Sequence, residues 1–169
     1  MDSSAPFSPN GGLTLIPTPG FEEFAHKIKT RIEEMGNTHN RMRTPTDTVI
    51  LDFNLHKNKE PYLRLGKDHI GEHDCVIITS GPGTSEMRDQ LGIALWYLVG
   101  RRARRITVVS LYFPIARSDK DEGRDILALA KYVVHMMVAA SCGELNRIVS
   151  FDLHSPQIVL AGPRPGTFA

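Results

Sequence analysis

The stretch HDCVIITS, residues 73–80, is the strongest strand candidate in this chain of 169 residues. It is rich in β-branched residues, and its apolar run shows no polar alternation, so both faces of the strand would be buried. A strand of this kind belongs inside a mostly parallel sheet that helices cover. The following Gly81, Pro82 and Gly83 break the strand and lead into a helical pattern.

Outward from this strand, strands alternate with helices along the chain. Short apolar runs predict further strands at residues 13–16, 48–53, 60–65, 105–112 and 147–153. Apolar residues at three- and four-residue steps predict helices at residues 21–36, 84–100 and 123–142. This alternation is typical of βαβ units joined by right-handed crossovers. We therefore predict an α/β fold with an open, mostly parallel sheet and helices on both of its faces.

Length and composition indicate one globular domain. We expect it at residues 13–160, between a disordered tail at 1–12 and an irregular tail at 161–169. The first dozen residues lack the features of a signal peptide, and no apolar run approaches the roughly 20 residues that span a bilayer. A cytoplasmic protein without a membrane partner is therefore expected, and its two cysteines are expected to be reduced. A formal net charge of +1 gives no reason to expect a nucleic-acid partner.

Three segments bring polar side chains to the carboxyl ends of strands, where parallel sheets bind ligands. The first, SGPGTSE at residues 80–86, favours a plain tight turn with a helix N-cap over a phosphate-binding loop. The second, YFPIARSDKDEGRD at residues 112–125, crowds charges of both signs behind a core strand. It suits a clamp of Arg and Lys on a polyphosphate with carboxylates for Mg²⁺, and equally a solvated loop.

The third segment is FDLHSPQ, residues 151–157. Side chains two apart on a strand face the same way, so Asp152 and His154 would point together into one crevice. They could hold a hard cation whose shell water completes, or carry out acid–base catalysis. The basic run RRARR, residues 101–105, is expected to be the solvated last turn of a helix.

Together these motifs resemble the N-terminal half of ribose-phosphate pyrophosphokinases, also called phosphoribosyl pyrophosphate synthetases. The resemblance rests on HDCVIITSGPGTSEMRDQL, RRITVVSLYFPIARSDK and RIVSFDLHSPQI, which begin at residues 73, 104 and 147. Their order and spacing fit the family, and the likeness runs from about residue 13 to residue 157. It implies the first of two phosphoribosyltransferase-like α/β halves.

The resemblance implies an enzyme, a ribose-phosphate diphosphokinase of nucleotide biosynthesis. In its reaction, the diphosphoryl group of Mg-ATP moves to the anomeric hydroxyl of ribose 5-phosphate, which yields phosphoribosyl pyrophosphate and AMP. The family forms dimers that stack into rings. The resemblance therefore also implies a homo-oligomer, or a hetero-oligomer with full-length family members.

The resemblance further implies roles for individual residues. The ATP-binding residues would be Asn58, Glu60, Arg117, Ser118, Asp119, Lys120 and Asp121, and the Mg²⁺ ligands would be Asp152 and His154. Asn58 and Glu60 match a loop that recognises adenine, but His56 replaces the aromatic residue that stacks on the base. An imidazole could still stack there, or nearby Phe53 could take its place.

Departures from the family pattern leave other readings open. Ser118 stands for Gln and Asp121 for Lys, and no carboxylate follows Gln157, where the family has an Asp-containing metal-binding segment. The family's second half, with its ribose 5-phosphate loop, is also missing, so we expect the chain alone to be inactive. One alternative is a non-catalytic regulatory or assembly subunit. Another is a stand-alone nucleotide-binding domain that uses Asp152 and His154 for Mg²⁺.

Overall fold

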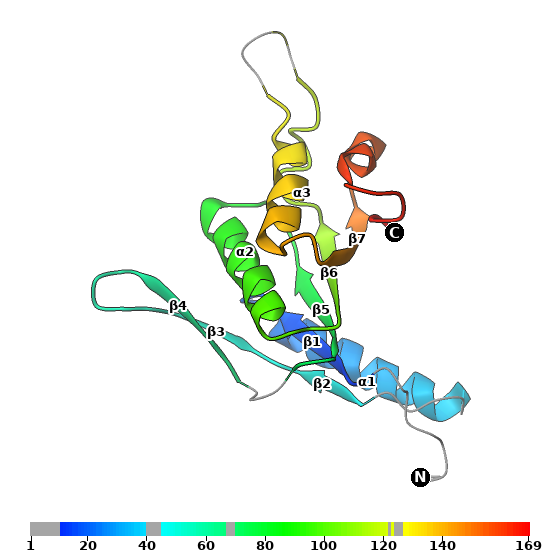
Figure 1. Cartoon of the computed structure of the whole chain (residues 1–169). Helices are drawn as coiled ribbons and strands as arrows, with labels where there is room; N and C mark the ends of the chain where they lie inside the picture. Colours follow the sequence, from blue (N-terminus) through cyan, green and yellow to red (C-terminus); the bar gives the residue numbers. More distant parts are fainter. Residues whose placement is uncertain (1–10, 40–44, 67–69, 122, 124–126) are drawn as a thin grey trace.

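A parallel sheet of five strands forms the centre of the molecule (Figure 1). The computed structural model describes residues 11–39, 45–66, 70–121, 123 and 127–169. The strands follow the order β2-β1-β5-β6-β7, and each pairs with its neighbour in parallel. Their bounds are Leu13–Pro17 (β1), Thr46–Thr48 (β2), Asp74–Thr79 (β5), Arg105–Tyr112 (β6) and Leu145–Asp152 (β7). The predicted mostly parallel α/β sheet is confirmed, and residues 1–10 of the predicted tail lie outside the described residues.

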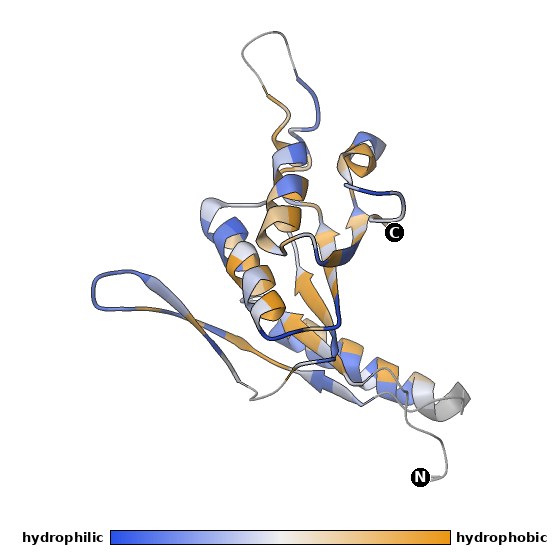
Figure 2. Cartoon of the chain, in the orientation of Figure 1, coloured by the Kyte–Doolittle hydropathy of each residue, from blue (hydrophilic) through white to orange (hydrophobic). Residues whose placement is uncertain are grey.

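Helices cover both faces of the sheet, because β5 is apolar on both sides. The helices are α1 (Glu22–His39), α2 (Ser85–Gly100) and α3 (Leu129–Ala140). Cys75 and Ile77 of β5 pack in the core with α2 and α3, whereas Ile78 packs with Leu15 and with Ala25 of α1. Figure 2 shows the apolar central strands between these polar-faced helices. Within the described part of the chain, no helix is long and apolar enough to cross a membrane.

A separate β-hairpin projects from the sheet (Figure 1). It consists of β3 (Leu51–Leu55) and β4 (Pro61–Leu65), which pair antiparallel. The single strand predicted at residues 48–53 is therefore wrong, because this segment divides between β2 and β3. Val49 still donates its N–H to the carbonyl of Leu15 over 2.9 Å, and the chain then leaves the parallel sheet.

Two helix boundaries differ from the prediction. Helix α1 runs through Gly36, where the pattern had placed its end, to His39. A glycine inside a helix costs about 1 kcal/mol, which a helix of 18 residues tolerates. Helix α3 begins at Leu129 rather than at residue 123, and residues 124–126 lie outside the described residues. Side chains of the preceding loop bind the first amides of α3, and these bonds mark where the helix begins.

The last residues of the chain lie along the outer edge of β7. After a short 3₁₀ helix, η1 (Pro156–Ala161), the chain returns to this strand. Ile148 donates its N–H to the carbonyl of Thr167 over 2.6 Å, and Ala169 donates its N–H to the carbonyl of Ile148 over 2.9 Å. These bonds occupy backbone groups that an edge strand otherwise exposes.

The amino ends of β5 and β6 are joined by an ion pair whose contribution to stability depends on pH. Arg105 donates through Nε to Oδ1 of Asp74 over 2.8 Å and through Nη2 to Oδ2. This hydrogen bonding holds the pKa of Asp74 below its ordinary value. The stabilisation is therefore complete above the ordinary value of about 4 and is lost as the pH falls through the lowered folded pKa.

We expect Asp74→Asn to lower the free energy of unfolding near neutral pH by up to about 1 kcal/mol, the range of partly exposed pairs. The difference from the wild type should shrink to nothing as the pH falls through the folded pKa. Urea unfolding of the wild type and of Asp74→Asn across this pH range measures the two free energies of unfolding. Glu23→Gln, which breaks the exposed pair with Lys27 on α1, serves as the control and should cost less. If Asp74→Asn is still less stable than the wild type at low pH, the loss of stability does not come from the ion pair with Arg105.

Candidate functional site

Three loops meet at the carboxyl edge of the sheet. They follow β5, β6 and β7, and backbone hydrogen bonds join them. Gly81 donates its N–H to the carbonyl of Tyr112 over 2.7 Å, and Phe113 donates its N–H to the carbonyl of Asp152 over 2.9 Å. Because neighbouring parallel strands end at this edge, their loops form the usual place for a ligand in an α/β sheet.

The glycine loop after β5 is a closely packed turn. A Cβ on Gly83, whose φ is +85°, would lie 2.9 Å from Cβ of Pro114, and a Cβ on Gly81 would lie 2.5 Å from the Tyr112 ring. The hydroxyl of Thr84 accepts the N–H of Met87 over 3.3 Å and caps α2. The structure therefore supports the predicted tight turn with an N-cap, since neighbouring loops account for both glycines.

The charged loop after β6 places Asp119 against the loop after β7. A hydrogen bond with the side chain of buried Ser155 is the main reason that the pKa of Asp119 lies below its ordinary value. The charges of Lys120 and His154 act in the same direction, while partial burial opposes them. The fold thus brings Asp119, Lys120 and His154 together from segments more than thirty residues apart.

Two other residues of this loop bind the first turn of α3. The Asp121 carboxylate accepts the N–H of Ala128 over 2.7 Å. The Ser118 hydroxyl accepts the N–H of Leu129 over 3.1 Å and donates to the carbonyl of Leu127 over 3.2 Å. These two predicted ATP-binding residues therefore face the helix through their polar atoms.

Asp152 and His154 lie at the end of β7, but not both within the strand. The strand ends at Asp152, and His154 has a left-handed backbone with φ +60°. The N–H of His154 donates to Oδ1 of Asp152 over 2.9 Å, which closes a tight turn. The prediction assumed that both residues lie on the strand, where side chains two apart face the same way. His154 lies beyond the strand, so the hydrogen-bonded turn, and not the strand geometry, brings this pair together.

The donors at this edge suit a hard cation only in part. Among the described residues, no group of three or more His, Cys, Asp or Glu side chains could hold a metal ion. Asp152 and His154 are exposed and would supply two ligands, and Asp119 reaches toward the same loop. Such a set fits Mg²⁺, which binds through one or two carboxylates and takes its remaining ligands from water and substrate phosphates.

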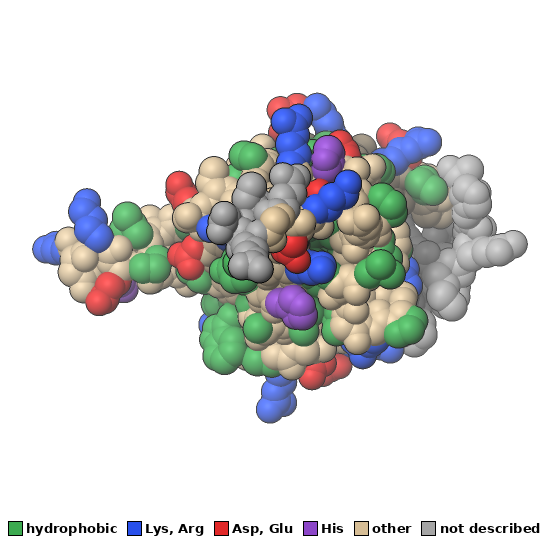
Figure 3. Space-filling view, turned by 90° about the horizontal axis from the view of Figure 1, so that it is seen from above, with side chains coloured by type: hydrophobic (Ala, Val, Ile, Leu, Met, Phe, Trp, Pro, Cys, Tyr) green, Lys and Arg blue, Asp and Glu red, His purple; other side chains and the backbone are tan. Residues whose placement is uncertain are grey.

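Figure 3, seen from above, shows this end of the molecule. Acidic, basic and histidine side chains lie side by side on it, whereas apolar side chains are scattered around them. A surface with both charges suits a polyanion that binds together with a cation, because basic side chains bind the anion and acidic side chains bind the cation.

The predicted adenine residues lie elsewhere, at the tip of the β3–β4 hairpin (Figure 1). Glu60 donates its backbone N–H to Oδ1 of Asn58 over 3.2 Å, which shapes the turn. The ring of His56 lies 4.5 Å from the ring of Tyr62, centroid to centroid. Phe53 packs against the core, so it is not at the tip. A single copy of the chain does not bring this hairpin tip to the charged loop.

Sequence reasoning missed two residues of these sites. Ser155 joins the two polar loops, and its only sequence signal was its position next to His154. Tyr62 supplies an aromatic ring beside His56, which the hairpin pairing of β3 with β4 makes possible. Both depend on contacts between segments, which the spacing of motifs does not reveal.

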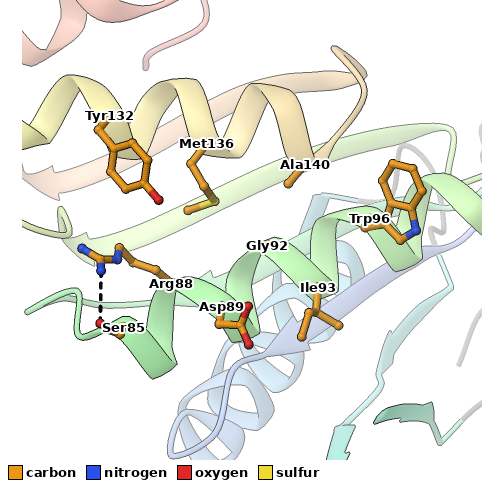
Figure 4. A pocket seen from close by; sticks show the side chains of 9 residues that line it. All are labelled: Ser85, Arg88, Asp89, Gly92, Ile93, Trp96, Tyr132, Met136 and Ala140. Carbon is orange, nitrogen blue, oxygen red and sulfur yellow. Dashed lines mark hydrogen bonds between the residues drawn. The ribbon is translucent and has the colours of Figure 1, made fainter. Parts of the chain in front are cut away.

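A groove of about 430 Å³ lies between α2 and α3 (Figure 4). Ser85, Arg88 and Trp96 line it on the α2 side, and Tyr132 and Met136 on the α3 side. The Arg88 guanidinium lies 5.8 Å from the centre of the Tyr132 ring. No residue predicted to bind ATP or metal lines this groove, so the polar carboxyl edge remains the candidate site.

Comparison with curated proteins confirms the resemblance to ribose-phosphate pyrophosphokinases. The chain is 32% identical over 106 residues to ribose-phosphate pyrophosphokinase 2 of Saccharomyces cerevisiae, a match that covers 61% of this chain and 32% of the yeast protein. It is 35% identical over 101 residues to the ribose-phosphate pyrophosphokinase of Maricaulis maris, covering 59% and 31% of the two chains. The match thus spans about a third of the length of these relatives. No family model matches the chain.

A solved structure shares the fold. The phosphoribosylpyrophosphate synthetase from Mycobacterium smegmatis superposes with a TM-score of 0.69, at 23% sequence identity. The superposition covers 93% of this chain and 48% of that chain. The likeness therefore extends from the motifs to the α/β architecture, over about half of the mycobacterial chain.

We expect Gly83→Ala to destabilise the protein by about 1–3 kcal/mol, since it combines a left-handed backbone with a crowded neighbourhood. Gly143→Ala is the matched control, because Gly143 has a similar φ of +81° and no atom within 4 Å of a Cβ. Chemical denaturation of both variants separates the cost of crowding from that of the backbone. Equal losses would show that the loops are not closely packed around Gly83.

Proposed function

We propose that this chain is the part of a ribose-phosphate pyrophosphokinase that binds ATP and Mg²⁺. The enzyme would transfer the diphosphoryl group of ATP to ribose 5-phosphate in the cytoplasm. The observation that carries the proposal is the convergence of Asp119, Lys120 and His154 beside Asp152. This cluster lies at the carboxyl edge of the sheet, within the region of likeness to the pyrophosphokinases. Its chemistry suits a triphosphate bound together with a divalent cation.

In this proposal, Arg117 and Lys120 donate charge-assisted hydrogen bonds to phosphate oxygens. Both side chains are exposed, and the charge of Lys120 acts on the neighbouring Asp119 carboxyl. Asp152 and His154 would hold Mg²⁺, which neutralises charge on the phosphates when bound. Diphosphoryl transfer needs little covalent help from a protein, and orientation with charge neutralisation supplies most of the rate.

The position of the hairpin is the reason to propose an oligomer. Asn58 and Glu60 would recognise adenine, yet they lie far from the charged loop of the same copy (Figure 1). The hairpin of a second copy, or of a full-length relative, would meet this need by reaching the charged loop of the first. The nucleotide would then bind between two subunits, with its base on one and its phosphates on the other.

A second candidate function is a regulatory or assembly subunit without activity of its own. The position of Asp121 favours this candidate, since its carboxylate occupies the start of α3 where the resemblance leads one to expect a lysine. Formation of AMP from Mg-ATP and ribose 5-phosphate by the assembled protein distinguishes the two. Turnover supports the enzyme, and nucleotide binding without turnover supports the subunit.

We expect Lys120→Ala to weaken Mg-ATP binding about tenfold or more, because a hydrogen bond from a charged donor contributes about 1.5–3 kcal/mol. Asp152→Ala and His154→Ala should weaken binding only when Mg²⁺ is present. Isothermal calorimetry with and without Mg²⁺ measures these effects. Lys27→Ala, an exposed lysine of α1, is the control and should bind as the wild type does. Unchanged affinity in all three site variants would refute the proposed site.

Two binding-deficient variants should complement each other if the hairpin acts across subunits. Asn58→Ala with Glu60→Ala removes the adenine residues, and Lys120→Ala removes the phosphate donor. After co-expression, a mixed dimer contains one site with both parts intact. We therefore expect Mg-ATP binding at up to half of the sites, measured by calorimetry on the purified mixed assembly. If binding stays at the level of the separate variants, both parts act within one copy.

A further inference from the structure

The first turn of α3 is capped from outside the helix. Its N-cap residue, Ala128, has no side-chain cap, and its first turn contains no acidic residue. Three consecutive N–H groups, of Ala128, Leu129 and Ala130, are instead bound by the Asp121 carboxylate, the Ser118 hydroxyl and the Ser118 carbonyl, over 2.7, 3.1 and 2.9 Å. We call this set of contacts the α3 clasp. It satisfies amides that a helix start otherwise leaves without partners.

We propose that Ser118 and Asp121 are positioning residues, which hold the charged loop through the α3 clasp, and that they are not ligands of the ATP phosphates. The consequence for the nucleotide rests on the proposed function. The clasp itself rests on contacts within the chain alone.

Residue chemistry supports this division of roles. An amide N–H needs an acceptor, and a hydroxyl or a carboxylate supplies one, whereas a lysine ammonium can only donate. Asp121 and Ser118 stand where the family resemblance leads one to expect Lys and Gln. At Asp121 the departure therefore supplies an acceptor for the Ala128 amide that Lys could not provide.

Charge supports it as well. The N-terminus of a helix favours an anion, and the Asp121 carboxylate already lies there. A phosphate at the same place would have to displace a tethered carboxylate and would be repelled by it. The phosphates are therefore left to the exposed cations of the loop, Lys120 and Arg117.

The loop is held from two directions. Ser118 and Asp121 bind the start of α3, and the carboxyl of Asp119, between them in sequence, lies near Ser155 after β7, whose side chain lowers the pKa of Asp119. Lys120 lies between these two attachments. Restraint on both sides limits the conformations of its backbone, so its ammonium group needs less ordering when a phosphate binds.

The test compares Asp121→Ala with Asp121→Asn, because Asn keeps an acceptor oxygen and Ala does not. We expect exchange of the Ala128 amide hydrogen to quicken about fivefold in Asp121→Ala, the effect of losing a typical cap. Mg-ATP affinity should fall by at most the same factor, since the apparent affinity follows the fraction of chains whose loop is fastened and competent to bind. Asp121→Asn should remain close to the wild type in both measurements, made by hydrogen-exchange NMR and calorimetry.

Thr84→Ala is the matched control. It removes the side-chain cap of α2, so it carries a similar cost in stability, but it leaves the α3 clasp intact. Its Mg-ATP affinity should equal that of the wild type. If Asp121→Ala does not fold, Ser118→Ala replaces it, with exchange at Leu129 as the readout and Ser118→Thr as the variant that restores the hydroxyl.

Other outcomes would overturn the inference. If Asp121 contacts the phosphates, both Asp121 variants will bind Mg-ATP more tightly, because a repelling charge has been removed, and amide exchange will not change. If amide hydrogen exchange at Ala128 is faster in Asp121→Ala but the affinity for Mg-ATP is unchanged, the positioning role is rejected. If the wild-type chain binds no Mg-ATP, both the proposed function and the positioning role of Ser118 and Asp121 are rejected. Amide hydrogen exchange at Ala128 still decides, independently of nucleotide, whether the α3 clasp exists.

Discussion

Strand β5 places Cys75 and Ile77 against α2 and α3 and Ile78 against α1, and it pairs with β1 on one side and β6 on the other. Burial on both faces requires helices above and below the sheet. In a parallel sheet, these helices lie in the crossover connections between one strand and the next. Because β5, β6 and β7 run in the same direction, their carboxyl ends meet at one edge. The charged loop, the glycine loop and the Asp152 turn are close together for this reason.

The packing of these loops leaves little freedom at the site. Gly81 and Gly83 lie against Tyr112 and Pro114, and a backbone hydrogen bond ties Phe113 to Asp152. The polar side chains are exposed, but the backbone from which they extend is closely packed. Exposed charges are screened by water and salt, so their effect depends on being held in position more than on their number. The α3 clasp and the contact of Asp119 with Ser155 provide this restraint.

The sequence supplied a hypothesis about which residues make up the candidate site, but it could not give their arrangement. It placed Asp119, Lys120 and His154 on segments that follow neighbouring strands, and a parallel sheet brings such segments together. It could not show that Asp121 turns toward α3, because the amide it binds belongs to a residue seven positions further on. Nor could it show that the hairpin carries Asn58 and Glu60 away from the other predicted residues, since the single strand expected at 48–53 divides in the structure.

The sequence by itself determined the fold class, because hydrophobic periodicity and the order of strands and helices are local properties of the chain. It also determined the family resemblance, which the likeness to known pyrophosphokinases confirms. The tertiary structure decided which polar groups face one another, which helix start each loop residue binds, and where the hairpin projects. Those features depend on contacts between residues distant in sequence, and only the packed sheet sets the distances between them.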